Sequence, residues 1–341
     1  MFTMLILYRH GRDSKINVWA FSDEDEQSMS TTLPIEDSSS HRKQPWLLHS
    51  LTIPTLNFCS FACCPISSIS AIQHDQHDDE EKSSTSPTGS SPDSSLLIAV
   101  SGQNDSTIDL YHLPSEKKVG MIPAPEVVNG KSGMVMALKM FHSSTQDLHV
   151  IAGYESGRTY VYKQAKQQWD PIYTNCPHSQ PILALDVWPG RDFYCTSSAD
   201  AVIAKHRLDA EVDVDVENVP KVVQTRHAGQ QGLRLRSDGR ILATAGWDGR
   251  IRVYSAKSMK ELAVLKWHKD GCYAVAFASI DGGGVQDMSD STSSVSDSVV
   301  VTKSSSAVQQ TVGQARDTKA RNTHWLAAGA KDGKVSLWDI Y

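Results

Sequence analysis

Three kinds of side chain that could carry out proton transfer recur along this chain of 341 residues. A histidine precedes a turn aspartate in three places: His178 with Asp200, His227 with Asp248 and His268 with Asp332. Hydroxyl groups lie shortly before two of these aspartates, at Thr244 in one copy and at Ser197 or Ser198 in another. An imidazole between a carboxylate and a hydroxyl can serve nucleophilic catalysis, so the elements that position these residues must decide their role.

A fixed spacing identifies those elements. In six segments, a turn residue is followed six positions later by an aromatic residue or a histidine that closes an alternating apolar strand. The pairs are Asp13/Trp19, Asp105/Tyr111, Ser156/Tyr162, Asp200/His206, Asp248/Tyr254 and Asp332/Trp338. The best-kept copies are LATAGWDGRIRVYS at 242–255 and LAAGAKDGKVSLWDIY at 326–341. Each copy predicts a β-hairpin in which Gly249 or Gly333 takes the positive φ that the turn requires.

A regular period of strand, tight turn and strand predicts an all-β fold, a β-propeller made of four-stranded blades. Six blades are visible, and we expect residues 1–341 to form one propeller domain. Three stretches poor in large apolar side chains, at about 22–44, 65–95 and 279–322, are predicted to be disordered insertions. The strand count leaves the first blade without an inner strand and the last without an outer strand. We therefore expect a seven-bladed family from which the N-terminal blade is missing here.

The turn segments resemble WD-repeat proteins. In those proteins the turn aspartate bonds a histidine one strand earlier, and that histidine bonds a serine or threonine and the closing tryptophan. The resemblance assigns three such networks: His227, Thr244, Asp248 and Tyr254; His268, Asp332 and Trp338, with Ala328 at the hydroxyl position; and His178, Asp200 and His206, with Ser197 or Ser198. We therefore interpret these histidines and aspartates as structural and not catalytic.

Other residue patterns give weaker signals for chemistry. The run HDQHDDEE at 74–81 places two histidines beside acids, but it lies in a Ser/Pro-rich insertion without closing ligands. We interpret it as a solvated charged run and not as a metal site. The six cysteines form no CxxC pair, and no phosphate-binding glycine loop or nucleophile elbow is present in the sequence. The sequence therefore predicts a protein that is not an enzyme, with no metal and no cofactor.

Three residues are candidates for binding a partner protein. Trp247 directly precedes the turn residue Asp248, and Arg12 holds the same place in the first copy. Trp267 is next to His268, and we expect it at the same end of its blade as Trp247. Exposed tryptophan and arginine are common anchors of interfaces. The alternative is that the two indoles only pack on adjacent loops.

The charge balance gives no reason to expect tight binding to nucleic acid. The formal net charge is −6, with both signs spread along the chain. The apolar start MFTMLILY is too short to span a membrane, and no secretory signal follows it. We expect an intracellular protein with reduced thiols and no direct contact with nucleic acid or membrane.

Four segments resemble the fungal ASTRA-associated protein 1 family, whose animal counterpart is the guanine nucleotide-binding protein β-subunit-like protein 1. They are HGRDSKINVWAF at 10–21, RKQPWLLHSLTIPTLNFCSFA at 42–62, ILATAGWDGRIRVYS at 241–255 and HWLAAGAKDGKVSLWDIY at 324–341. The resemblance implies a nuclear subunit of the ASTRA complex. It also implies links to chromatin remodelling and to assembly of phosphatidylinositol-3-kinase-related kinases with Tel2 and Tti proteins.

Three classes of function follow from these observations. The first is a WD-repeat scaffold that holds ASTRA subunits, with Trp247, Trp267 and Arg12 as contacts. The second is a G-protein β-like signalling adaptor, which would need an N-terminal coiled-coil helix that the sequence does not show. The third is a propeller enzyme, which would place acids or histidines around its central channel, whereas the residues here fall on repeat-network positions.

Overall fold

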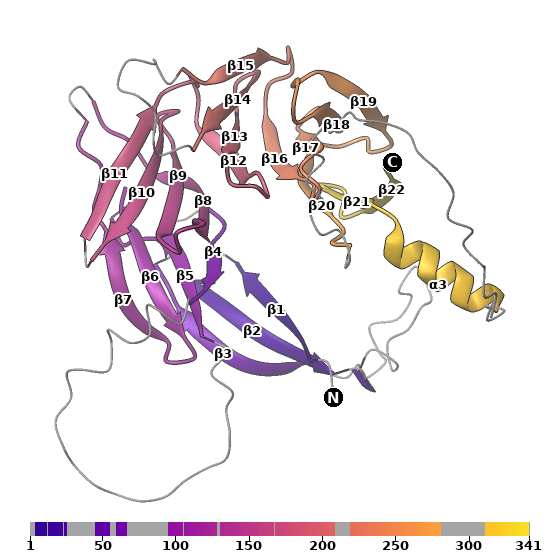
Figure 1. Ribbon diagram of the computed structural model, residues 1–341, viewed down its shortest axis with the longest axis horizontal. Helices are drawn as coiled ribbons and strands as arrows, with labels where there is room; N and C mark the ends of the chain where they lie inside the picture. The colour runs from indigo at the N-terminus through magenta and orange to yellow at the C-terminus, as the bar shows by residue number, and fades with distance from the viewer. Residues whose placement is uncertain are drawn as a thin grey trace, which may run out of the picture. The chain divides into compact units, whose positions relative to one another are not determined.

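The computed structural model describes residues 4–11, 13–22, 24–25, 45–54, 59–66, 95–104, 106–127, 130–166, 168–208, 219–280 and 311–340. The chain divides into two compact units. Unit 1 is Met1–Val187 with Arg191–Ala228, and unit 2 is Trp188–Gly190 with Gly229–Tyr341. Their strands belong to six antiparallel sheets, labelled in Figure 1 and called blades 1 to 6 in chain order.

Unit 1 contains four of the blades, and neighbouring strands in each follow chain order. Blade 1 consists of β1 (Met4–His10), β2 (Lys15–Ser22) and β3 (Trp46–Thr52). Blade 2 consists of β4 (Ala62–Pro65), β5 (Leu96–Ser101), β6 (Ile108–Leu113) and β7 (Lys117–Ile122). Blade 3 consists of β8 (Val135–His142), β9 (Leu148–Tyr154), β10 (Thr159–Ala165) and β11 (Gln168–Asn175). Blade 4 consists of β12 (Ile182–Val187), β13 (Phe193–Ser198), β14 (Val202–Arg207) and β15 (Lys221–Gln224).

Unit 2 contains the other two blades. Blade 5 consists of β16 (Gln230–Leu235), β17 (Ile241–Gly246), β18 (Arg250–Ser255) and β19 (Glu261–Lys266). Blade 6 consists of β20 (Cys272–Phe277), β21 (Trp325–Ala330) and β22 (Val335–Asp339), with the helix α3 (Val312–Asn322) preceding β21. The all-β fold and the six propeller blades that the sequence predicts are thus confirmed. Within the described residues, blades 1 and 6 have three strands each, which matches the strand count made from the sequence.

Neighbouring blades within a unit pack face to face through apolar side chains. Ile16 and Val18 of β2 meet Ile98 and Val100 of β5 in one buried cluster, so blades 1 and 2 share a core. Equivalent clusters join blades 2 and 3, blades 3 and 4, and, within unit 2, blades 5 and 6. The second strand of blade 3, β9, therefore has apolar neighbours on both of its faces. This explains why β9, with the sequence LHVIAGY, is buried at every residue and does not alternate.

The closing aromatic residues stand at a repeated irregularity. The pairing with the outer strand, between β2 and β3 in blade 1 and between the third and fourth strands in blades 2, 3 and 5, shifts register directly before the closing aromatic. These aromatics are Trp19, Tyr111, Tyr162 and Tyr254. A β-bulge bends the strand and increases its local twist. The fixed place of the aromatic in the sequence therefore corresponds to a fixed place in the blade.

The predicted insertions lie largely outside the described residues, as does the run at 74–81. Where the third insertion is described, residues 312–322 form α3 and are not disordered. Its sequence VGQARDTKARN contains Ala, Arg, Gln and Lys, which favour helix, and the Trp325 indole donates to the Ala320 carbonyl at 3.0 Å. The prediction of one domain over 1–341 stays a prediction.

Two Asp-Gly turns of unit 2 provide a matched test of this packing. Gly249 and Gly333 have φ values of +73° and +74°, but an added Cβ at Gly249 would lie 2.9 Å from the Asp270 carbonyl oxygen, whereas at Gly333 it would meet nothing within 4 Å. Both alanine variants should lose about 1–2 kcal/mol of unfolding free energy because a left-handed backbone disfavours a side chain. Gly249→Ala should lose about 1–3 kcal/mol more through the close contact. Urea titration of both variants measures the difference, and equal losses would contradict this packing.

Candidate functional site

Blade 4 holds a continuous chain of polar side chains inside unit 1. His178 Nδ1 is 3.2 Å from Asp200 Oδ1, and His178 Nε2 is 2.8 Å from the hydroxyl of Thr196. That hydroxyl is 3.1 Å from His206 Nε2, and His206 Nδ1 is 2.9 Å from the hydroxyl of Tyr173. The chain joins the turn, the second strand, the third strand and the neighbouring blade 3. Its carboxylate also accepts the backbone N–H groups of Ser179 and Val202, which fixes the turn.

The hydroxyl in this chain belongs to Thr196, whereas the sequence analysis expected Ser197 or Ser198. Side chains alternate along a strand, so Ser197 points to the opposite face of β13. Ser198 lies at the end of the strand, where its hydroxyl donates to the Gln180 carbonyl at 2.9 Å. Thr196 stands four residues before Asp200, the same interval that separates Thr244 from Asp248. Applying one interval to both copies would have found it.

Burial holds the two histidines of blade 4 in their neutral form. The pKa of His206 is lowered to about 3, first by burial and then by the nearby His178. Burial also lowers the pKa of His178, although Asp200 opposes this effect. His206, Thr196 and Tyr194 are fully buried. Because a substrate cannot reach these buried side chains, the hydrogen-bonded network serves to hold blade 4 together.

Blade 6 builds its network with a different hydroxyl. His268 Nε2 is 2.9 Å from the hydroxyl of Ser336, which also accepts a hydrogen bond from the Trp338 indole at 2.9 Å. His268 Nδ1 lies 3.8 Å from the carboxylate of Asp332. Ser336 pairs directly with Ala328 across β21 and β22. The hydroxyl missing at Ala328 is therefore supplied from the facing strand, a substitution that the sequence analysis did not anticipate.

In blade 5 a buried guanidinium binds the turn aspartate. Arg252 donates to the two carboxylate oxygens of Asp248 at 3.2 Å and 2.6 Å. Two parallel charge-assisted hydrogen bonds of this kind are strong and directional. Thr244 and Tyr254 are buried in the same blade, and burial raises the pKa of Tyr254 to about 12. His227 is exposed and belongs to unit 1, so its pairing with Asp248 stays a prediction.

The remaining repeat positions are less uniform. Asp13 accepts a hydrogen bond from Arg9 at 2.9 Å, and the ring of Trp19 is partly buried. Burial raises the pKa of Tyr111, with Asp109 adding to the effect. Tyr162 is buried and its hydroxyl lies 3.0 Å from that of Tyr154. Asp105 and Arg12 lie outside the described residues.

Two tryptophans project from adjacent loops of unit 2. Trp247 is 46% exposed and Trp267 is 53% exposed. The Trp247 indole donates to the side-chain oxygen of Gln231 at 2.8 Å, and Trp267 packs edge-on against His268 with ring centroids 4.8 Å apart. Their loops touch, because an added Cβ at Gly271 would lie 3.0 Å from the Trp247 carbonyl oxygen. One end of unit 2 thus presents two rigidly held indole rings.

The structure also exposes an apolar stretch that the sequence analysis missed. Trp46 is 76% exposed on β3, the outer strand of blade 1, and Leu47 and Leu48 follow it. Edge strands with exposed apolar side chains are frequent binding sites. The sequence Trp46-Leu47-Leu48 could have indicated this exposed stretch, because three successive apolar residues in an outer strand cannot all point inward.

Within the described part of the chain, no three or more His, Cys, Asp or Glu side chains are grouped so that they could hold a metal ion. No helix among those residues is long and apolar enough to cross a membrane. The histidine, aspartate and hydroxyl side chains, whose residue types suit catalysis best, are those of the buried blade networks. The exposed side chains described above, on the Trp247 and Trp267 loops and on β3, are aromatic and apolar.

Comparison with known proteins agrees with this arrangement. A family model described as "WD domain, G-beta repeat" matches residues 220–255 and 320–339, which include the turns at Asp248 and Asp332. ASTRA-associated protein 1 of Aspergillus flavus is 42% identical to this chain, over 99% of this chain and 82% of its own length. The protein of the same name from Aspergillus niger is 44% identical over 98% of this chain and 81% of its own. The chain belongs to the ASTRA-associated protein 1 family.

Family similarity extends to more distant fungi. ASTRA-associated protein 1 of Schizosaccharomyces pombe is 34% identical over 56% of this chain and 58% of its own length. The match with the Aspergillus proteins covers both units of the structure, including blades 1 to 4, where the general WD-repeat model finds less. The ASTRA-associated protein 1 family therefore describes this chain more fully than the repeat model does.

Substitution of Thr196 should show how much the polar chain of blade 4 contributes. Thr196→Val keeps the shape of the side chain but leaves His178 Nε2 and His206 Nε2 without their hydroxyl, which should cost about 1–3 kcal/mol of unfolding free energy. Thr196→Ser keeps the hydroxyl and should cost less. Hydrogen exchange of peptides from β12 to β15 measures both. Equal protection in the two variants would show that the hydroxyl is not needed.

Acid should weaken blade 4 through His206. An unfolded histidine binds a proton near pH 6.5, whereas the folded pKa is about 3, so the stability that neutral His206 provides is complete above pH 6.5 and declines as the pH falls. The loss should reach about 2 kcal/mol by pH 5. Hydrogen exchange of blade 4 at pH 7 and pH 5, corrected for intrinsic rates, should show the decline in the wild type. His206→Phe should be less stable at pH 7 but show a smaller pH dependence; an unchanged dependence would refute this assignment.

Proposed function

We propose that the protein is a non-enzymatic WD-repeat scaffold subunit of the ASTRA complex. The observation that carries the proposal is the 42% identity to ASTRA-associated protein 1 of Aspergillus flavus over 99% of this chain. The name of that relative states an association with ASTRA, and near-complete coverage of this chain supports the same association here. A propeller scaffold binds its partners through loops held by a rigid framework.

The proposal includes a place and a role in the cell. We expect the chain in the nucleus, where ASTRA would connect it with chromatin remodelling. We also expect it to take part in the assembly and stability of phosphatidylinositol-3-kinase-related kinases together with Tel2 and Tti proteins. These expectations come from the family resemblance, and the absence of strongly basic composition agrees with a role through protein partners and not through direct contact with nucleic acid.

The mechanism would be presentation of Trp247 and Trp267 at one end of unit 2. Backbone hydrogen bonds fix both loops. The Lys331 N–H donates to the Gly271 carbonyl at 2.9 Å, and the Trp247 N–H donates to the Gly229 carbonyl at 3.0 Å. Gly229, with φ of +74°, lets the indole of Trp247 lie over it, because an added Cβ would approach the ring to 2.2 Å. Preformed aromatic side chains lose little freedom on binding, so they are effective anchors. Arg12 remains a third candidate from the sequence.

Affinity purification of the tagged chain from fungal cells, followed by mass spectrometry, tests the proposed association. Tel2, Tti proteins and the related kinases should be recovered at levels well above those obtained with an unrelated propeller. Microscopy of a fluorescent fusion at native expression tests the nuclear location. Recovery of none of the ASTRA proteins would refute the association.

Substitution of the two tryptophans tests the proposed contacts. Trp247→Ala and Trp267→Ala should each reduce recovery of ASTRA partners about tenfold or more, because a buried interface tryptophan contributes roughly 2 kcal/mol or above. Leu262→Ala, which truncates a side chain 57% exposed on β19 of the same unit, is the matched control and should leave recovery unchanged. The thermal unfolding midpoint should stay the same in all three variants. A tryptophan variant that loses both partners and stability would place its ring in the framework.

A further inference from the structure

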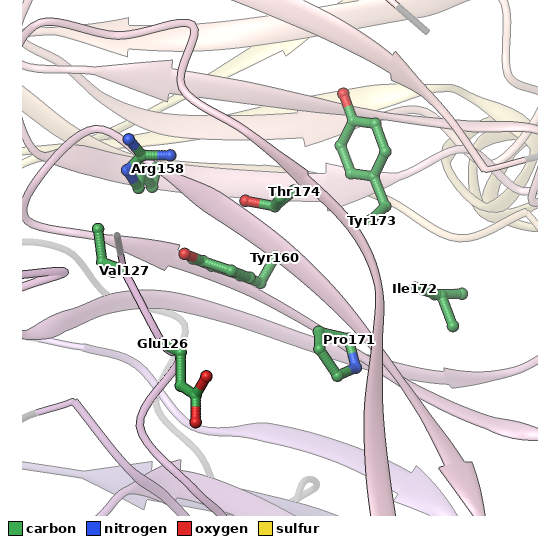
Figure 2. A pocket seen from close by; sticks show the side chains of 8 residues that line it. All are labelled: Glu126, Val127, Arg158, Tyr160, Pro171, Ile172, Tyr173 and Thr174. Atoms are coloured by element: carbon green, nitrogen blue, oxygen red, sulfur yellow. The ribbon is translucent and has the colours of Figure 1, made fainter. Parts of the chain in front are cut away.

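A second surface site lies in unit 1, next to blade 3. It is a pocket of about 440 Å³, a volume within the usual range for ligand pockets. Figure 2 shows its lining, which comes from the segment after β7 (Glu126 and Val127), from Arg158 just before β10, and from strands β10 and β11. Of the lining residues, Tyr173 also takes part in the polar chain of blade 4 through its hydroxyl on His206, and the tryptophan loops use none of them.

Three polar groups of the pocket lack partners. The guanidinium of Arg158 and the hydroxyls of Tyr160 and Thr174 line it, and within the described residues none of these groups makes a hydrogen bond or an ion pair. In the view of Figure 2, Arg158 lies above the ring of Tyr160 and Glu126 lies below it. A cation and two hydroxyls without partners, gathered at one opening, are the groups expected of a site that receives an anion.

The ring of Tyr160 is held in place before any ligand arrives. Tyr160 packs edge-on against Tyr154 with ring centroids 5.5 Å apart and stacks on Tyr162 at 5.9 Å. Tyr160 pairs with Thr174 across β10 and β11, and the Arg158 carbonyl accepts the Tyr154 N–H at 2.8 Å. The packed ring of Tyr160 would need little ordering on binding.

A β-bulge supplies the apolar wall of the pocket. The register places Tyr162 opposite Pro171 and Val161 opposite Tyr173, so Ile172 is the extra residue of the bulge. It is 45% exposed. Pro171 lacks a backbone donor on β11, the outer strand of the blade, and this disfavours pairing with an added strand. A ligand would therefore be recognised through its side chains.

The charges favour a carboxylate over a phosphate. The pocket carries one cation, Arg158, and one anion, Glu126, and that glutamate repels a phosphate dianion more strongly than a carboxylate with a single negative charge. A single carboxylate can form two parallel hydrogen bonds to the guanidinium. Resting on the scaffold role proposed above, we propose that this pocket binds a short extended segment of a partner protein, with an Asp or Glu side chain on Arg158 and an adjoining aliphatic side chain against Ile172 and Pro171.

Capped pentapeptides test the proposal on the purified full chain. The probes have a central Asp between Leu, Val or Ile residues, and matched sets replace this Asp with Asn or phosphoserine. Fluorescence polarisation should show that at least one Asp peptide binds about tenfold or more tightly than its Asn counterpart, as expected for a charge-assisted pair. Arg158→Gln should abolish the difference, and Ile172→Ala should weaken the Asp and Asn peptides alike. Arg226→Gln, at an exposed arginine elsewhere in unit 1, should change nothing.

Several outcomes would overturn the proposal: equal binding of Asp and Asn peptides, binding by none of the peptides, or an Asp preference that survives in Arg158→Gln. Tighter binding of the phosphoserine set would assign the pocket to a phosphorylated partner instead. Failure here differs from failure of the scaffold function. If wild type recovers ASTRA proteins from cells but binds no peptide, the pocket proposal alone falls; if peptides bind as expected and no ASTRA protein is recovered, the ASTRA association falls.

Discussion

The structure depends on burial of second strands against neighbouring sheets, as in blade 3, which packs between blades 2 and 4. Every residue of β9 and β17 is buried, so polar side chains near the ends of such strands cannot turn to water. An unpaired polar group in that position is costly, and a partly satisfied network is worse than an apolar core. The chain from Asp200 through His178 and Thr196 to His206 meets this requirement while it ties the turn to two strands.

In blades 5 and 6 one additional position contributes a polar side chain to the network. This position lies on the third strand, two residues before the closing residue, and faces the hydroxyl position across the strand pair: Ala204 opposite Thr196, Arg252 opposite Thr244 and Ser336 opposite Ala328. Alanine suffices in blade 4 because its chain is complete. Ser336 restores the hydroxyl in blade 6, and Arg252 binds the turn aspartate in blade 5. Blade 6 thus tolerates the alanine at the hydroxyl position because the facing residue, Ser336, supplies the hydroxyl.

Local features of the sequence were enough to predict the hairpins, since an Asp-Gly turn and alternating side chains act over a few residues. The choice between Thr196 and the two serines needed only a consistent interval before the turn aspartate. Ser336 and Arg252 required the cross-strand register, although both lie four residues after a turn aspartate, symmetric with the hydroxyl position before it. The pocket at Arg158 could not be predicted, because its wall depends on a bulge and on a segment from the preceding blade.

The candidate binding surfaces lie where a blade departs from the hydrogen-bonded network seen in blade 4. Blade 3 has Ser156 at its turn and Ala152 opposite Tyr160, and its three tyrosines, Tyr154, Tyr160 and Tyr162, are buried and pack against one another. Tyr160 is therefore free of the network and directs its hydroxyl to the pocket. In blade 5 the indole of Trp247 likewise stands beside a turn that Arg252 already secures. Residues released from holding the blade together are available to recognise partners, while intact networks in other blades keep them in position.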